Sequence, residues 1–346
     1  VAGTVTIDSI TPVEGAGTYG IDDSLQLKIV LSQAVVVTYN TGAEPFINLN
    51  TGGKAVYNSG TGSTELIFIY TVGSSDTSVS NLNISSSNLI LPSGTTIQAD
   101  GDNIELNLPT SNLTQWVIDT LRPTITNISG SSGTFKANDS VTLQVTFNED
   151  VTVNSSSGNP YINLNSGGKA IYSDAQSGSI LNFIYTVGSS DNTISLDCSG
   201  GLNLSGATIS DNAGNELNDF TITTNSLSGN ADIIIDTISP TITKITSDLV
   251  NKTYEADEVI FINVEFSEDI TTQSFTQGEF PYIGLNVNTS GDRIANAVYD
   301  SISGSNIIKF KYTIQTGDHT FNTNLDCSGG LNLSGGTITD IVLNTA

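Results

Sequence analysis

The stretch Val141-Thr-Leu-Gln-Val-Thr-Phe147 alternates strictly between apolar and polar side chains. Successive side chains of a strand point to opposite faces of a sheet, so this alternation predicts a β-strand with one face packed against a core. The same apolar spacing recurs in Leu25-Gln-Leu-Lys-Ile-Val-Leu31 and in Ile260-Phe-Ile-Asn-Val-Glu-Phe266. Three copies of one half-buried strand in a chain of 346 residues indicate a tandem repeat.

The boundaries of the repeat follow from the motif Asp-x-x-x-Pro, which begins at Asp8, Asp119 and Asp236. Its spacing is close to the ~100 residues of one immunoglobulin-type sandwich. We therefore predict one module at residues 9–119, a second at 120–236 and a third at 237–346. Residues 1–8 are expected to be the closing strand of a preceding module or a donor strand, and the third module is expected to lack its own closing strand.

The segments around the alternating strand support an all-β fold. A second strand is predicted at residues 45–50, 160–165 and 281–286, each followed by a Gly-rich turn. The strands are short, no stretch has helical periodicity, and the turns are dense in Gly, Asn and Ser. This pattern predicts tandem immunoglobulin-like antiparallel β-sandwich modules of about seven strands, arranged as an extended rod.

Composition limits the class of partner. The chain has 10 Lys and Arg against 35 Asp and Glu, a net charge of −25, which disfavours nucleic acid and makes cations the natural counterpart. No stretch of 18 or more apolar residues exists, so no membrane span is expected. The absence of Met is typical of a processed product or of a window from a longer array, and we expect the latter, with strand donation between subunits as the alternative.

The two cysteines, Cys198 and Cys327, occupy the same place in successive repeats. Equivalent positions in separate modules lie much farther apart than the ~7 Å between Cα atoms that a disulfide tolerates. Ile84 stands at about this place in the first repeat. We therefore predict free, buried thiols with a role in the cores.

Acidic residues are expected to meet at one pole of each module, where the start of the first strand, the end of the alternating strand and the last loop converge. A hard cation is then needed to offset the repulsion, and calcium, which takes 6–8 oxygen ligands, fits best. The alternative is that these are ordinary turn residues. The candidate ligands are Asp119, Glu149, Asp150, Asp211 and Asn215 in the second repeat and Asp236, Glu268, Asp269 and Asp340 in the third.

The three repeats differ in how well they support this site. The third loop, Ile-Val-Leu-Asn344, has no Gly, and the first repeat offers Gln33 and Ala34 in place of two carboxylates, beside Asp8 and two loop aspartates, Asp100 and Asp102. The first site is therefore expected to be weak or absent. At the opposite pole, turn acids that include Asp76, Asp191 and Asp318 are interpreted as solvated, with a second cation site as the alternative.

The motifs Phe-Asn/Ser-Glu, Asp-Asn-Ala-Gly-Asn and Ile-Asp-Thr-x-x-Pro, taken together, resemble the bacterial immunoglobulin-like tandem repeats of giant surface adhesins and biofilm-associated proteins. The resemblance covers essentially the whole chain and is strongest in the second repeat. It implies a secreted, rod-like stalk at the bacterial cell surface, stiffened by calcium between modules. By motif it carries the ligand role to Asp119, Glu149, Asp211 and Asn215, and to Asp236, Glu268 and Asp340 in the third repeat.

Three function classes are to be considered for such a chain. A non-enzymatic stalk or filament segment, with neighbouring repeats or subunits as partners, is the first. The second is a self-assembling surface-layer or filament subunit that polymerises by strand donation, or a module that binds a glycan or a host or cell-surface protein. An enzyme is disfavoured because His319, the only His, lies in one repeat alone. Trp116, the only Trp, is expected to pack beneath the joint between modules.

Overall fold

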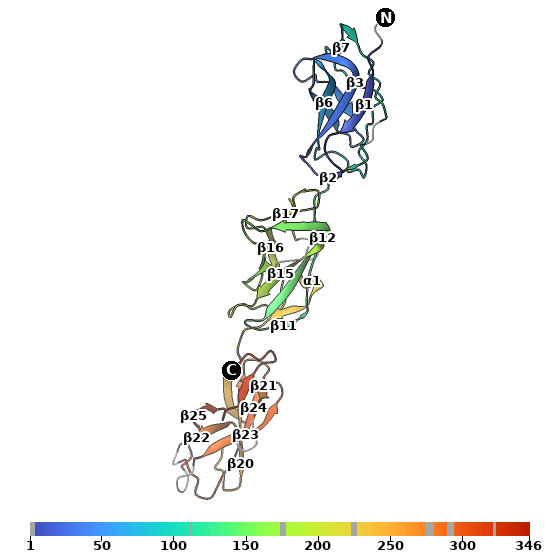
Figure 1. Ribbon diagram of the computed structural model, residues 1–346. Coiled ribbons are helices and arrows are strands. Elements are labelled where there is room, and N and C mark those ends of the chain that lie inside the picture. Colours follow the sequence, from blue (N-terminus) through green and yellow to red (C-terminus); the bar gives the residue numbers. More distant parts are fainter. Residues whose placement is uncertain are drawn as a thin grey trace.

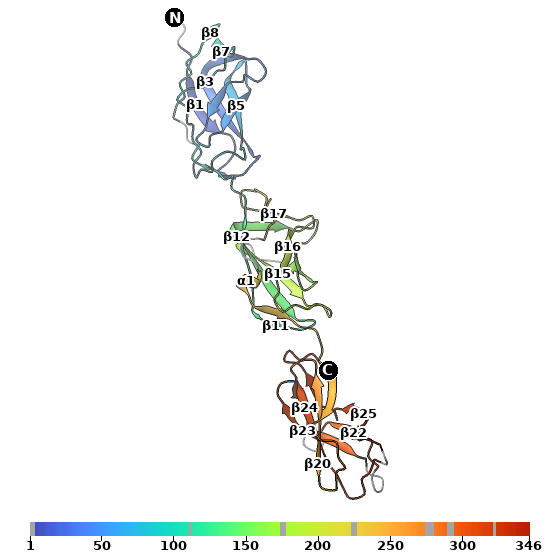
Figure 2. The same ribbon diagram turned by 180° about the vertical axis from the view of Figure 1, so that it is seen from behind.

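The computed structural model describes residues 4–110, 113–173, 178–222, 227–273, 280–288, 294–320 and 323–346. These residues form mostly antiparallel β-strands, which confirms the prediction of an all-β chain. Within these ranges the only helix, α1 (Leu227–Asn230), has four residues. No described helix is long and apolar enough to cross a membrane. Figures 1 and 2 show three groups of strands that follow one another along an elongated molecule.

The first group, called the first unit below, is built around one long strand. Its strands are β1 (Ile7–Pro12), β2 (Gly17–Tyr19), β3 (Ser24–Thr38), β4 (Phe46–Asn48), β5 (Lys54–Ser59), β6 (Ser63–Thr71), β7 (Thr96–Ala99), β8 (Asp102–Asn103) and β9 (Trp116–Ile118). The sheet runs β4-β5-β6-β3-β7-β8, with β1 also paired to β3. An irregularity between Val30 and Val35 lets the first half of β3 pair with β6 and the second half with β7.

The second unit repeats this plan. Its strands are β10 (Ile125–Gly130), β11 (Gly133–Phe135), β12 (Ser140–Asn154), β13 (Tyr161–Leu164), β14 (Lys169–Tyr172), β15 (Gly178–Thr186), β16 (Cys198–Asn203), β17 (Thr208–Ser210) and β18 (Ile233–Ile235). The long strand β12 again pairs with two partners, β15 along its first half and β17 along its second.

The third unit divides the long strand into two. Its strands are β19 (Ile242–Ser247), β20 (Val259–Phe266), β21 (Thr271–Gln273), β22 (Tyr282–Leu285), β23 (Asn296–Ser303), β24 (Ile307–Thr313), β25 (Cys327–Asn332) and β26 (Thr337–Thr339). The main sheet runs β19-β20-β24-β23-β22-β25, and β21 pairs with β26.

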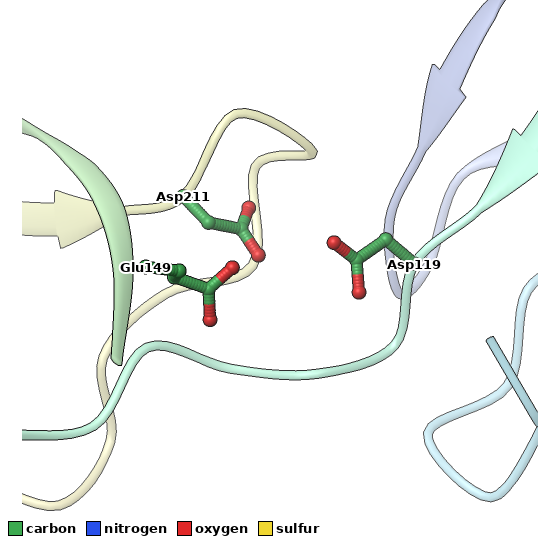
Figure 3. A group of neighbouring side chains, drawn as sticks. All are labelled: Asp119, Glu149 and Asp211. Carbon is green, nitrogen blue, oxygen red and sulfur yellow. The ribbon is translucent and has the colours of Figure 1, made fainter. Parts of the chain in front are cut away.

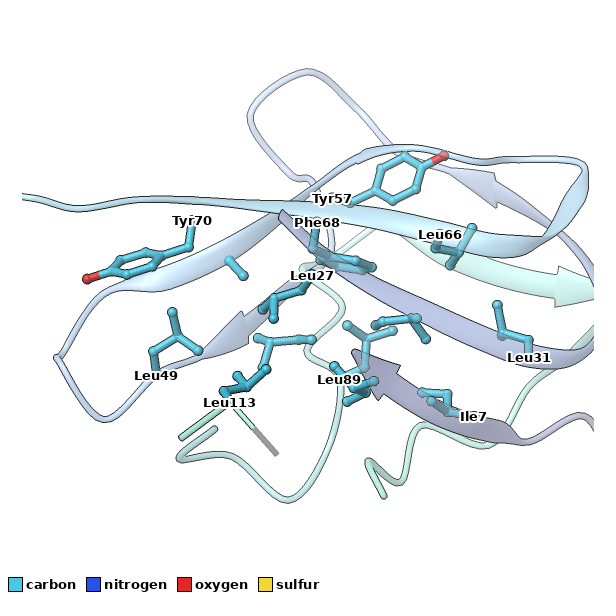
Figure 4. Close-up of a cluster of buried hydrophobic side chains, with 14 of the residues drawn as sticks. Ile7, Leu27, Leu31, Leu49, Tyr57, Leu66, Phe68, Tyr70, Leu89 and Leu113 are labelled. Carbon is cyan, nitrogen blue, oxygen red and sulfur yellow. The ribbon is translucent and has the colours of Figure 1, made fainter. Parts of the chain in front are cut away.

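The alternating strands bury the faces that the sequence predicts. Leu25, Leu27 and Ile29 are fully buried, and the equivalent residues of β12 and β20 are at most 5% exposed. Figure 4 shows the first of three separate apolar clusters, in which Leu27 and Phe68 lie near the middle. Burial of these side chains is the main favourable contribution to the stability of each unit.

Two pairs of strands run parallel, which the sequence analysis did not predict. β2 pairs with β9 in the first unit, and β11 pairs with β18 in the second. The opening segment of each unit is divided, so that β1 or β10 stays with the long strand while β2 or β11 lies beside the closing strand. Trp116 of β9 is fully buried and donates through Nε1 to the carbonyl of Gly15, 2.9 Å away.

Residues 5–8 belong to the first unit, which corrects their predicted role as the closing strand of a preceding module or a donor strand. Val5 and Ile7 are buried in the first cluster, and Ile7 pairs with Leu31 as Ile125 pairs with Phe147. Asp8 is therefore equivalent in register to the residue after Ile125 rather than to Asp119. Its Asp-x-x-x-Pro spacing imitates the linker motif inside a strand, and residues 1–3 lie outside the described residues.

The cysteines are free, as predicted, and partly rather than fully buried. Cys198 pairs with Leu164 and Cys327 with Leu285, while Ile84 bridges Leu49 in the first unit. The three residues therefore share one position against three different cores. Burial raises the pKa of the Cys198 thiol to about 12, with a smaller contribution from the charge of the preceding aspartate.

Candidate metal centres

Two clusters of three carboxylates are present among the described residues. Asp119, Glu149 and Asp211 form the first, and each offers an oxygen within 4.8 Å of those of the other two. Figure 3 shows Asp119 on the linker that follows β9, facing Glu149 and Asp211 of the second unit. The second cluster repeats the arrangement with Asp236, Glu268 and Asp340. All six are candidate ligands in the sequence analysis.

Each side chain reaches the cluster because of a specific local structure. Asp119 and Asp236 directly follow β9 and β18, the closing strands. Glu149 lies in the part of β12 between Thr146 and Val151 where pairing with β15 is interrupted, and such a bulge redirects a side chain toward the end of a sheet. Asp211 is the first residue after β17.

The last loop of each unit wraps around its own aspartate. Asp211 Oδ1 accepts hydrogen bonds from the backbone N–H groups of Ala213 and Asn215, both at 2.8 Å. Asp340 Oδ1 accepts the equivalent bonds from Val342 at 2.9 Å and Asn344 at 2.8 Å. The two loops therefore have the same hydrogen-bonding pattern and present one carboxylate each to the linker.

This equivalence is found although the third loop has no glycine. Gly214 has φ 88°, and Leu343 takes its place with φ 70°, a left-handed conformation that costs a residue with a Cβ atom about 1–2 kcal/mol. From the sequence, the missing glycine makes the third site less well supported than the second. The loop forms nevertheless, because Asp340 and Asn344 supply its hydrogen bonds.

Charge is concentrated at both clusters without a basic partner. Burial raises the pKa of Glu149, as do the charges of Asp211 and Asp119, while a hydrogen bond from Asn148 lowers it. Burial also raises the pKa of Glu268, together with the charges of Asp236, Asp340 and Asp269. No Lys or Arg forms an ion pair with these carboxylates within the described ranges. Bringing the acids together therefore costs free energy that a bound cation would offset.

The unfavourable free energy is clearest at one carboxylate oxygen of the third unit. Glu268 Oε1 is buried and has no hydrogen-bond partner among the described residues. A buried, unsatisfied carboxylate oxygen is strongly destabilising unless a cation or a donor satisfies it. The candidate ligand atoms of both clusters are carboxylate oxygens, without His or Cys. They therefore fit a hard dication such as calcium better than zinc.

Four predicted or related residues lie outside the carboxylate clusters. Asp150 and Asp269 are exposed and stand next to the clustered glutamates, but neither belongs to a cluster. Asn215 acts through its amide: Nδ2 donates to the carbonyls of Asp119 at 3.0 Å and Leu121 at 3.1 Å. Asn344, which the ligand prediction omitted, donates in the same way to the carbonyl of Asp236. The shared spacing Asp-x-x-x-Asn is the signal that could have identified it.

The first unit has no cluster of three acids among its described residues. Gln33 and Ala34 stand where Glu149 and Asp150 stand in the second unit. Asp8 accepts a hydrogen bond from the hydroxyl of Thr6, two residues earlier, at 2.8 Å, and Asp100 and Asp102 are exposed. The register shift at Asp8 removes the linker aspartate on which the predicted first site depended.

The acids at the opposite pole have structural partners. Asp76 Oδ2 accepts from the hydroxyl of Tyr70 at 2.7 Å and from the Gly73 N–H at 3.0 Å. Asp191 binds Tyr185 in the same way at 2.7 Å. Asp318 and Tyr312 form the third copy. The spacing Tyr-x5-Asp in all three repeats was the signal that the sequence analysis missed.

Comparisons with known proteins do not identify a family for this chain. No family model and no curated protein matches this chain. The solved structures that overlap with it include domains 4–9 of surface layer protein SbsC, with 11% identity, a TM-score of 0.15, and coverage of 99% of this chain and 64% of that chain. Domains 1–6 of SbsC give 13% identity, a TM-score of 0.16, and coverage of 95% and 53%. This chain thus spans less than two thirds of those chains, and TM-scores this low do not define a shared fold.

Proposed function

We propose that this chain is a non-enzymatic, calcium-stiffened segment of an extracellular stalk or filament at a bacterial cell surface. Its modules are immunoglobulin-like sandwiches, and calcium makes their series a rod. The observation that carries this proposal is the repeated cluster of three carboxylates at a joint, with the buried Glu268 oxygen that lacks a donor. The neutral polar surface, the net charge of −25 and the resemblance to adhesin repeats favour an exported protein.

The position of the ligands explains how a cation would stiffen the chain. Asp119 belongs to the linker after the first unit, whereas Glu149 and Asp211 belong to the second unit. A cation bound by all three would fix the linker against the second unit. The turn at Gly20 already lies against the same loop, because a Cβ atom there would collide with the carbonyl of Ala213.

The expected energy is modest. Extracellular calcium modules bind with dissociation constants of about 10⁻⁴–10⁻³ M. At millimolar calcium, linkage then adds about 1 kcal/mol per site to the stability of the folded joint. Such a site would be filled outside the cell and largely empty at cytosolic calcium concentrations.

Small-angle X-ray scattering of the whole chain with calcium and with chelator tests the proposal. We expect calcium to narrow the range of molecular lengths that the chain samples in solution. Glu149→Gln with Glu268→Gln should abolish this response, whereas the matched control Asp150→Asn with Asp269→Asn, which removes the same charge from exposed neighbours, should retain it. Equal flexibility in calcium and chelator would refute the calcium-stiffened stalk.

A second candidate, a subunit that assembles into a surface layer or filament, is favoured by one observation. Ile245 of the third unit is 47% exposed, although its equivalents are buried in the other two units. An uncovered apolar position on a strand is suited to pairing between chains. Sedimentation velocity over a wide concentration range distinguishes the candidates, because a stalk segment stays monomeric.

A further inference from the structure

The closing strands of the first two units are held along both edges. β9 pairs in parallel with β2 on one side, and on the other side Ile118 exchanges two backbone hydrogen bonds of 2.9 Å with Val79. β18 pairs with β11 and exchanges the same two bonds with Thr193 through Ile235. Each closing strand therefore fills a slot between two backbone segments.

These strands also cover the core. Trp116 and Ile233 are fully buried, as are Leu113 and Leu227, which precede the two closing strands. A Cβ atom on Gly130 would lie 3.0 Å from the side chain of Ile233, so β18 packs against the end of β10. The slot thus accepts an aliphatic or aromatic side chain at alternate positions.

The third unit has the segment that forms one wall of this slot. Ile245 pairs with Val264 as Ile128 pairs with Val145, which fixes the register between the two units. The turn that follows is also shared, because the N–H of Glu255 donates to Glu258 as the N–H of Lys136 donates to Asp139. Counted back from this turn, residues 252–254 correspond to β11. In the second unit β18 pairs with β11. Among the described residues of the chain, no strand pairs with the equivalent residues 252–254.

The core beneath this slot is uncovered. Ile245 is 47% exposed, whereas Ile128 is fully buried and Ile10 is 4% exposed. Leu325 is only partly buried, although Leu82 and Leu196, its equivalents, are fully buried. We call the surface formed by Ile245, Leu249, Tyr254 and Leu325 the third-unit groove.

We propose that the third-unit groove binds an extended peptide segment in which an aliphatic or aromatic residue is followed by x-aliphatic-Asp-Thr, paired in parallel with residues 252–254. The equivalent slots define this occupant, because they hold Trp116-Val-Ile-Asp-Thr120 and Ile233-Ile-Ile-Asp-Thr237. The start of a second copy of this chain is a poorer occupant, because Val5 and Ile7, the nearest match there, are buried in their own core. The proposal does not depend on calcium.

Binding is tested with the whole chain and a fluorescently labelled synthetic peptide of residues 227–237, Leu-Ser-Gly-Asn-Ala-Asp-Ile-Ile-Ile-Asp-Thr. Fluorescence anisotropy should show saturable binding, and a peptide with Ile233→Asp and Ile235→Asp should not bind. Ile245→Asp in the chain should weaken binding at least about tenfold, a loss of ~1.4 kcal/mol. Val298→Asp is the matched control, because Val298 is 45% exposed on β23, and it should leave binding unchanged.

Hydrogen exchange locates the peptide. In the second unit the Gly133 N–H donates to the carbonyl of Asp232 at 2.9 Å, so the peptide should slow exchange at the equivalent amide, Lys252. The proposal is overturned by absent binding, by equal binding of the two peptides, or by unchanged exchange at residues 252–254. It is also overturned if the chain alone forms oligomers in which these amides are protected, since a second copy then fills the groove. Should Ile245→Asp unfold the third unit, the peptide pair and the exchange data still decide.

Discussion

The backbone N–H of Ile21 in the first unit donates a hydrogen bond of 2.8 Å to Oδ1 of Asn215 in the second unit. The same Asn215 side chain donates to the carbonyls of Asp119 and Leu121 in the linker between them. One buried amide therefore contacts the first unit, the linker and the loop that carries Asp211. Asn215 is a positioning residue for the joint, whether or not a cation is bound.

Asn215→Ala should loosen this joint. The variant removes the acceptor for Ile21 and leaves two linker carbonyls without their donor, so the linker should be cleaved faster by a protease that accepts residues 120–123. Asn212→Ala, at an exposed position of the same loop, is the control and should be cleaved like the wild-type chain. Equal cleavage rates for Asn215→Ala and wild type would show that Asn215 does not hold the joint.

Leu343→Gly should stabilise the third unit. Leu343 has φ 70°, which glycine adopts without the cost of a Cβ atom, so the free energy of unfolding should rise by about 1 kcal/mol. Denaturant unfolding measures the change. Ile341→Gly, in the same loop without a positive φ, should be neutral or destabilising, and a similar loss in Leu343→Gly would contradict the strain argument.

Glu268→Gln should have opposite effects with and without calcium. Glu268 Oε1 is buried without a donor among the described residues, beside the charges of Asp236 and Asp340. Removing its charge should therefore raise the melting temperature in chelator and remove most of the increase that calcium gives the wild type. Asp269→Asn is the exposed control. A variant that is less stable than wild type in chelator would contradict the assignment of Glu268 as the strained carboxylate.

Tyr185 should make the second unit sensitive to alkali. Burial is the main reason that its pKa is raised to about 12 from the ordinary value of 10.0; the hydrogen bond with Ser166 lowers the pKa, and the adjacent Asp191 raises it. Between these values the unfolded state releases the phenolic proton first, so stability is complete below about pH 10 and falls as pH rises toward 12. Tyr185→Phe should show a shallower loss over this range in thermal unfolding. An unchanged pH dependence would exclude Tyr185 as the titrating group.

The sequence predicted the strands and the acids for the same reason: both recur in register. Alternation identified β3, β12 and β20 because a shift of one residue would turn all the apolar side chains to the opposite face of the sheet. Glu149 and Glu268 were identified as candidate ligands because each follows such a strand at the same distance. The three acidic segments of a module meet only in a particular strand topology. The alignment of the repeats was sufficient to predict that topology.

The remaining features depend on backbone paths that a pattern of residue types does not specify. Asp8-x-x-x-Pro12 satisfies the linker motif but lies within β1, and only strand register distinguishes it from Asp119. The parallel pairs arise because the opening segment crosses to the closing strand, which polar and apolar alternation cannot indicate. The Tyr185 to Asp191 hydrogen bond was visible as a repeated spacing, yet turn acids are so often solvated that the spacing alone was not decisive.

Isothermal titration calorimetry of the metal-free chain with calcium tests the central claim most directly. Two carboxylate clusters among the described residues predict two bound ions per chain, one lost in Glu149→Gln, the other in Glu268→Gln, and both retained in Asp150→Asn. Absence of calcium binding, or a stoichiometry that neither glutamate variant changes, would contradict the account.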